Sequence, residues 1–171
     1  MCGIIGAISE ANVAPLLMEG LRRLEYRGYD SAGIATLSCG KVHRRRAGGK
    51  LAELSTLLES EPIKGSIGIG HTRWATHGVA NTTNAHPHAT DRVAVVHNGI
   101  IENFLQLRAE LEAKQYCFES ETDTEVILAL LDGYLEDGMS PSEATKAMLK
   151  QVEGAFALAI ISSAILFGTS A

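Results

Sequence analysis

Residues 1–9 read MCGIIGAIS, a short apolar run that follows a cysteine at position 2. The β-branched residues between glycines predict a strand over residues 3–9. If Met1 is removed, Cys2 carries both a thiol and a free α-amine. An α-amino group titrates at about 7.7–8.0, so part of it is unprotonated at neutral pH and can take the thiol proton. Taken alone, Cys2 is more simply read as a small hydrophobic residue near a chain end.

The chain has 171 residues, of which 46% are hydrophobic and 20% charged, and this composition predicts one globular domain with a substantial core. A net charge of −5 argues against nucleic acid as a partner. We interpret the basic cluster HRRR at 43–46 as a solvated strand edge.

Three cysteines, at positions 2, 39 and 117, form neither a disulfide framework nor a CxxC metal pair. The N-terminal segment lacks the basic and apolar regions of a secretory signal, and no stretch is long and apolar enough to cross a membrane. We therefore expect a cytoplasmic protein without a membrane association.

The periodicity predicts strands in clusters and helices in pairs, which favours an α+β domain of antiparallel sheets covered by helices. Thr122 and Glu125 predict a capping box for the helix over 122–138. The strand over 92–99 is expected to end in a turn at Asn98-Gly99. The expected strands are 3–9, 32–38, 41–46, 66–73, 92–99 and 154–162, and the expected helices are 11–27, 51–60, 103–111, 122–138 and 141–151.

Two segments gather polar side chains at loops. RRLEYRGYDSAG (22–33) contains Arg27-Gly28 at a helix end, and alone it is read as a charged helix terminus. HTRWATHG (71–78) brings two histidines, an arginine and the only tryptophan to a strand-to-loop junction. Arginine presents a planar fork suited to a carboxylate, and tryptophan a large apolar lid. A functional interpretation is favoured for the second segment.

Two further segments, NAHPH (84–88) and VVHNGIIEN (95–103), contain the pair Asn98-Gly99. A side-chain amide beside an unhindered backbone N–H is what an oxyanion hole requires, although a plain hairpin turn fits the pair equally well. In SETDTEV (120–126), Asp123 lies where the helix dipole favours a carboxylate. A binding role for Asp123 needs a cationic ligand group facing the helix start.

Together these segments resemble one family, the class II (N-terminal-nucleophile) glutamine amidotransferase domains, from Cys2 to about residue 161. The resemblance implies an α+β fold, a four-layer αββα sandwich of two antiparallel sheets, in a single domain over 2–171. It implies that Cys2 is the nucleophile with its own amine as base. Asn98 and Gly99 are implied to hold the oxyanion.

The resemblance also implies the residues that bind glutamine: Arg73 for the α-carboxylate and Asp123 for the α-ammonium. No cofactor and no metal are implied. Other positions match family positions in the same way, namely Thr76 and His77 in the glutamine site, Arg27 and Gly28 in support of the nucleophile, Trp74 at the gate for ammonia, and His86 near the second active site.

Within the family the motifs are most similar to the branch that supplies ammonia for conversion of fructose 6-phosphate to glucosamine 6-phosphate. The implied partners are L-glutamine and a sugar-phosphate isomerase domain that these residues do not include. The family's domain continues past the last residue here, so we expect a C-terminally incomplete domain that carries out at most the glutaminase half-reaction. An unpaired sheet edge would then favour association, and a homo-oligomer is left open.

Three alternatives stay open at this point. The domain could serve another class II amidotransferase, or it could be an inactive fragment that acts as an interaction module. A metal-binding module would use the histidines, but their spacing lacks a repeated ligand pair. These histidines are His71, His77, His86, His88 and His97.

Overall fold

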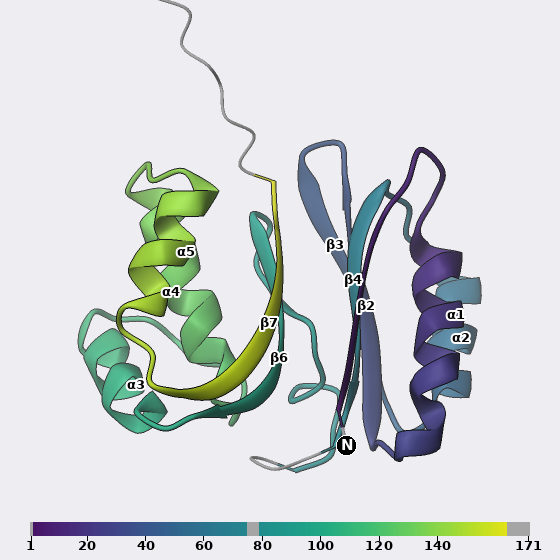
Figure 1. The fold of residues 1–171 in the computed structure, drawn as a ribbon, viewed down its shortest axis with the longest axis horizontal. Helices are drawn as coiled ribbons and strands as arrows, with labels where there is room; N and C mark the ends of the chain where they lie inside the picture. Colours follow the sequence, from purple (N-terminus) through teal and green to yellow (C-terminus); the bar gives the residue numbers. More distant parts are fainter. Residues whose placement is uncertain (1, 75–78, 164–171) are drawn as a thin grey trace, which may run out of the picture.

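A computed structural model describes residues 2–74 and 79–163 of the chain. In these residues two antiparallel sheets face each other in the middle of the molecule, and helices cover both outer faces (Figure 1). The layer order is helix, sheet, sheet, helix. The predicted αββα sandwich is therefore confirmed.

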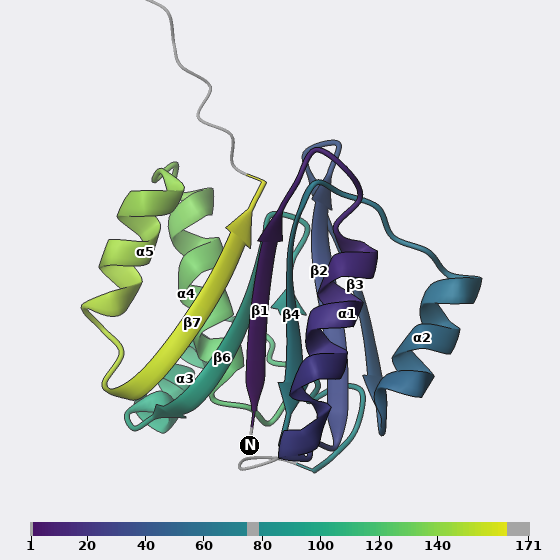
Figure 2. The same ribbon diagram turned by 45° about the vertical axis from the view of Figure 1, so that its right-hand side comes forward.

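The first sheet places the N-terminal strand at an edge. Its strand order is β1-β4-β2-β3, and β1 pairs with β4 in the register Gly3 to Thr72. The helices α1 and α2 pack on its outer face (Figure 2). Its strands are β1 (Gly3–Ile8), β2 (Ser31–Ser38), β3 (Lys41–Gly48) and β4 (Ile67–Arg73); the helices are α1 (Ala14–Leu24), the 3₁₀ turn η1 (Glu25–Arg27) and α2 (Leu51–Ser60).

The second sheet has the order β5-β6-β7 among the described residues, and helices cover its outer face (Figure 1). In sequence, α3, α4 and α5 all lie between β6 and β7, so the chain leaves the sheet and returns to the strand beside it. Its elements are β5 (His88–Ala89), β6 (Val93–Ile101), α3 (Phe104–Ala113), α4 (Thr124–Glu136), α5 (Pro141–Leu149) and β7 (Gly154–Ser162).

Small and β-branched side chains fill the space between the two sheets. This cluster includes Ala35 and Ile69 from the first sheet and Ala94 and Val96 from the second. Short side chains let the sheets approach closely, which brings the ends of β1, β4 and β6 into contact. None of the described helices is long and apolar enough to span a membrane.

Two local expectations at the second sheet are wrong. The strand β6 does not turn at Asn98-Gly99 but continues to Ile101, because Gly99 pairs with Phe156 of β7. The helix α4 has no capping box, because the Glu125 carboxylate accepts the backbone N–H groups of Glu119 and Ser120 from the preceding loop.

The prediction that the basic cluster at 43–46 is a solvated strand edge is also wrong. Arg44, Arg45 and Arg46 are only partly exposed. Arg46 donates to the carbonyl oxygens of Thr83 and Ala85, each at 2.9 Å, and Arg44 donates to Pro87 O at 3.4 Å. The cluster therefore fixes the backbone of the segment that precedes β5.

Candidate active site

The Cys2 thiol lies against the backbone of Trp74, at the end of β4. The Trp74 N–H donates to Cys2 Sγ at 3.2 Å, and the thiol donates to Trp74 O at 3.6 Å. These two contacts fix the position of the sulfur just before β1. Nothing in the sequence pattern pointed to this main-chain contact, because it depends on the β1–β4 register.

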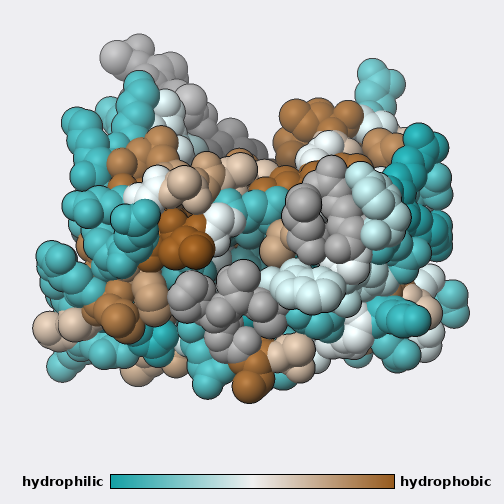
Figure 3. All heavy atoms as spheres, turned by 60° about the horizontal axis from the view of Figure 1, so that its bottom comes forward, coloured by the Kyte–Doolittle hydropathy of each residue, from teal (hydrophilic) through white to brown (hydrophobic). Residues whose placement is uncertain are grey.

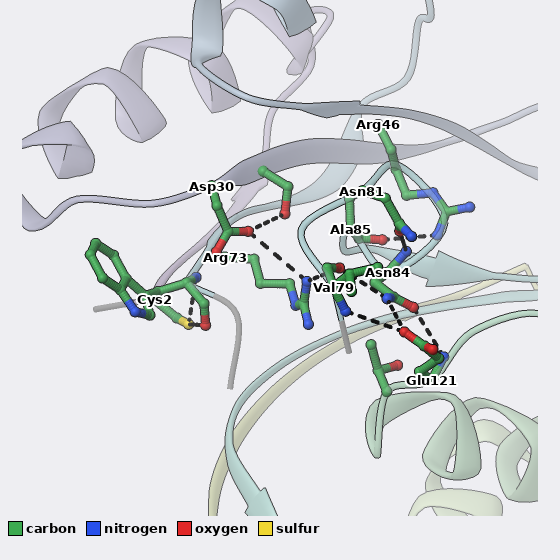
Figure 4. Close-up of polar contacts among 12 residues, drawn as sticks. Cys2, Asp30, Arg46, Arg73, Val79, Asn81, Asn84, Ala85 and Glu121 are labelled. Atoms are coloured by element: carbon green, nitrogen blue, oxygen red, sulfur yellow. Dashed lines mark hydrogen bonds and ion pairs between the residues drawn. The ribbon is translucent and has the colours of Figure 1, made fainter. Parts of the chain in front are cut away.

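Arg73 is only 4% exposed, and its guanidinium lies between Asp30 and Val79 (Figure 4). Its Nη1 donates to Val79 O at 3.4 Å and lies 4.0 Å from Asp30 Oδ1. A buried cation needs compensating charge, and a ligand carboxylate can supply more of it. This environment suits a residue that binds an anionic group.

Glu121 and Asn84 hold the backbone at Val79, and the sequence analysis did not single out this role for either residue. The Glu121 carboxylate accepts from Asn84 Nδ2 at 3.0 Å and from the Val79 N–H at 3.2 Å (Figure 4). Asn84 Oδ1 accepts in return from the Glu121 N–H. The hydrogen bond from Asn84 is the main reason that the pKa of Glu121 is below its ordinary value.

Asn98 and Gly99 lie on β6, opposite the start of β1. Asn98 Nδ2 donates to the Cys2 carbonyl oxygen at 3.4 Å, so the amide is beside the residue that carries the thiol. Gly99 has φ +127°, and a Cβ built there would be 2.2 Å from Ala155 O. Only glycine fits this position, where a free backbone N–H is needed for an oxyanion hole.

Asp123 precedes α4 and is 5% exposed. Its Oδ2 accepts the Ile101 N–H at 2.9 Å, and its Oδ1 lies 3.7 Å from His97 Nδ1. The first contact anchors the carboxylate to the end of β6, near Asn98 and Gly99. The arrangement can present a negative charge at the same end of the sheets as Cys2.

Gly28 and the Trp74 ring lie close together. Gly28 has φ +72°, and a Cβ there would be 2.7 Å from the Trp74 ring. Trp74 is 52% exposed. Thr76 and His77 lie outside the described residues, as does the side chain of Arg27, although its backbone forms the end of η1.

Figure 3 shows this end of the molecule with hydrophilic side chains along both flanks and smaller groups of hydrophobic ones between them. The predicted residues Cys2, Arg73, Asn98 and Asp123 come from four separate elements or their ends. The sandwich brings Cys2, Arg73 and Asn98 together around the start of β1. A thiol, a guanidinium, an amide and a carboxylate are thus present at one end of the two sheets.

The predicted residue His86 is part of a buried group of histidines between the sheets. Thr124 Oγ1 contacts both His86 Nε2 at 2.7 Å and His97 Nδ1 at 2.9 Å. Thr122 Oγ1 contacts His88 Nε2 at 2.9 Å. Among the residues that the structure describes, no cluster of three or more His, Cys, Asp or Glu could hold a metal ion.

Burial lowers the pKa of His71 to about 4 and the pKa values of His86 and His88 well below their ordinary value. The unfolded chain therefore binds more protons than the folded one below pH 6.5. We expect the free energy of unfolding to have its highest value above pH 6.5 and to fall as the pH is lowered toward 4. Each such histidine contributes on the order of 1 kcal/mol per pH unit.

Urea unfolding at several pH values between 4 and 8 measures this dependence. The matched variant His88→Gln removes one of the buried imidazoles. The slope of the free energy of unfolding against pH should then decrease by the contribution of up to one proton. An unchanged slope in this variant would show that His88 does not supply the acid sensitivity.

Two facing antiparallel sheets between helix layers, with a cysteine at the start of the first strand, are the arrangement of the N-terminal-nucleophile class of amidotransferases. Comparison with known families matches residues 71–166, more than half of the chain, to the "Glutamine amidotransferase domain". The chain belongs to the glutamine amidotransferase domain family. The resemblance seen in the motifs is confirmed.

Curated relatives are similar over nearly the whole chain. Glutamine--fructose-6-phosphate aminotransferase [isomerizing] of Mesorhizobium japonicum is 60% identical over 161 residues, which is 94% of this chain and 26% of the relative. The protein of that name from Brucella suis is 61% identical with the same coverage. The chain thus spans about a quarter of the length of these relatives.

Solved structures agree with this fold. The glutamine phosphoribosylpyrophosphate amidotransferase from B. subtilis has a TM-score of 0.80 at 27% identity, over 95% of this chain and 35% of that one. A glutamine aminotransferase class-II domain protein from Silicibacter pomeroyi has a TM-score of 0.56 at 15% identity, over 94% and 73% of the two chains, and supports the fold alone.

Proposed function

We propose that this chain hydrolyses L-glutamine to L-glutamate and ammonia, with Cys2 as the nucleophile. The observation that carries the proposal is that the Asn98 amide lies 3.4 Å from the Cys2 carbonyl oxygen while the Trp74 N–H is directed at the Cys2 sulfur. A nucleophile and a potential oxyanion donor are therefore adjacent. The general base is the Cys2 α-amine, which requires that the active form begins at Cys2.

Substrate binding follows from opposite charges at the two sides of the site. The buried Arg73 guanidinium takes the α-carboxylate of glutamine in competition with Asp30. Asp123 takes the α-ammonium with the oxygen that is not occupied by the Ile101 N–H. These two contacts orient the side-chain amide of glutamine toward the thiol.

The reaction then takes two steps. The α-amine accepts the thiol proton, sulfur attacks the amide carbon, and the oxyanion forms toward Asn98 Nδ2 and the Gly99 N–H. Collapse of this intermediate expels ammonia, with the proton returned from the amine, and leaves a γ-glutamyl thioester. Water attacks the thioester with the same amine as base and releases glutamate.

We further propose that this ammonia is used on a sugar-phosphate isomerase domain to convert fructose 6-phosphate to glucosamine 6-phosphate, with Trp74 at the gate for ammonia and His86 near that second active site. The names of the curated relatives support this acceptor. Their greater length supports a second domain as partner. The cytoplasm remains our expected location for this activity.

The direct test is an assay of glutamate and ammonia with the protein whose mass shows that it begins at Cys2. L-Glutamine should be hydrolysed, whereas N-acetyl-L-glutamine, which lacks the α-ammonium, should react at least about 10-fold more slowly because Asp123 loses its partner. No hydrolysis by the processed protein would contradict the proposed function and favour an interaction module. Equal rates with both substrates would contradict the binding role of Asp123.

A further inference from the structure

The Asn98 side chain extends from the second sheet and is held from two sides by groups of the first. Its Oδ1 lies 2.7 Å from His71 Nε2 on β4, and its Nδ2 lies 3.4 Å from the Cys2 carbonyl oxygen. An amide oxygen only accepts, so His71 Nε2 carries the proton of this hydrogen bond. If the amide were rotated by 180°, its oxygen would face the Cys2 carbonyl oxygen and two acceptors would meet. The two contacts therefore select one orientation of the amide.

His71 is itself held rigidly. Its side chain is fully buried, and its strand β4 pairs with β1 at Ile4 and with β2 at Gly33. The His86 ring packs against it with centroids 4.5 Å apart. A Cβ at Gly33 would lie 2.3 Å from His86 O, so the absence of a side chain there allows this approach.

We propose that His71 is a positioning residue for the oxyanion hole: its Nε2–H fixes the Asn98 amide so that Nδ2 is directed toward the reacting carbon beside Cys2. This inference rests on the proposed glutaminase function. Donors stabilise a developing oxyanion when they are oriented before the reaction begins. Without the hydrogen bond from His71, the amide can turn and present its oxygen instead. Burial supports the assignment, since the lowered pKa of His71 keeps the ring neutral at pH 7.

The test compares His71→Leu, which has no donor, with His71→Gln, whose Nε2 can reach the same place. His71→Leu should lower kcat for glutamine about 10- to 100-fold with KM changed less than about threefold, because the lost interaction acts in the transition state. His71→Gln should restore kcat to within a few-fold. In an Asn98→Ala background, His71→Leu should have no further effect on kcat, because the group that it positions is gone.

A second measurement separates positioning from damage to the fold. Alkylation of Cys2 by iodoacetamide displaces iodide at a saturated carbon and forms no oxyanion, so its rate should be the same in His71→Leu and the parent chain. The matched control His88→Gln changes another buried histidine that contacts Thr122 rather than Asn98, and its kcat should be unchanged.

Three results would overturn the inference: a parent-like kcat in His71→Leu, an equal loss of kcat in the Asn98→Ala background, or a loss of Cys2 alkylation in parallel with kcat. If the parent chain itself does not hydrolyse glutamine, the proposed function fails and this inference fails with it. A parent chain that is active beside an equally active His71→Leu contradicts the inference alone.

Discussion

Replacing Cys2 by alanine should abolish glutamine hydrolysis, with kcat reduced by a factor on the order of 10⁴ or more, the scale expected when a covalent nucleophile is removed from a hydrolase. The proposed reaction runs through a bond from the Cys2 sulfur to the amide carbon, and alanine carries no atom that can form it. Glutamine binding should persist, because Arg73 and Asp123 are untouched. Ammonia release measures the first effect and calorimetric titration with glutamine the second.

The chain supplies its own controls for this prediction. Cys39 and Cys117 are exposed, so they are open to non-selective thiol reagents. A glutamine-like electrophile should nevertheless label Cys2 alone, as read by peptide mapping, and Cys39→Ser with Cys117→Ser should leave hydrolysis intact. Label on the exposed cysteines instead of Cys2, or undiminished hydrolysis by Cys2→Ala, would sink the proposed mechanism.

A protein that retains Met1 tests the base separately from the sulfur. Its Cys2 nitrogen is an amide, which cannot accept the thiol proton. We expect hydrolysis to be lost in this form although the thiol is present. An active Met1 form would require another general base.

The sequence predicted the layers well because each strand and helix carries a strong local period. β2, β3 and β4 lie close to the expected ranges, and α5 begins at Pro141 as the pattern indicates. The wrong expectations depend on partners far along the chain. β6 passes through Asn98-Gly99 because β7 pairs with it, and no local signal in VVHNGIIEN reveals that pairing.

The site was predicted as a set of residues but not as a set of contacts. The motifs identified Cys2, Arg73 and Asn98, which the structure brings together. The Trp74 N–H on sulfur and the Glu121–Asn84 pair arise from strand register and loop packing, which a sequence pattern does not encode. The true capping box at Ser140 and Glu143 was readable from its S-x-x-E spacing.

Replacing Asn98 by alanine should lower kcat for glutamine by about 10²- to 10³-fold, which corresponds to ~2.7–4 kcal/mol of transition-state stabilisation for one oxyanion donor. KM should change little, because the ground-state charges of glutamine contact Arg73 and Asp123 instead. The Gly99 N–H remains, so residual hydrolysis should exceed that of Cys2→Ala. Steady-state kinetics with both variants prepared in parallel measures the difference.

Asn103 is the matched control for this variant. Its amide also uses both ends, donating to Gln151 O at 2.7 Å and accepting from the Glu153 N–H at 3.0 Å, but it lies outside the site. Asn103→Ala should lower the free energy of unfolding and leave kcat nearly unchanged, whereas Asn98→Ala should lower kcat. If Asn98→Ala raises KM and spares kcat, the Asn98 amide binds ground-state glutamine rather than the oxyanion, and the hole must be formed by other donors.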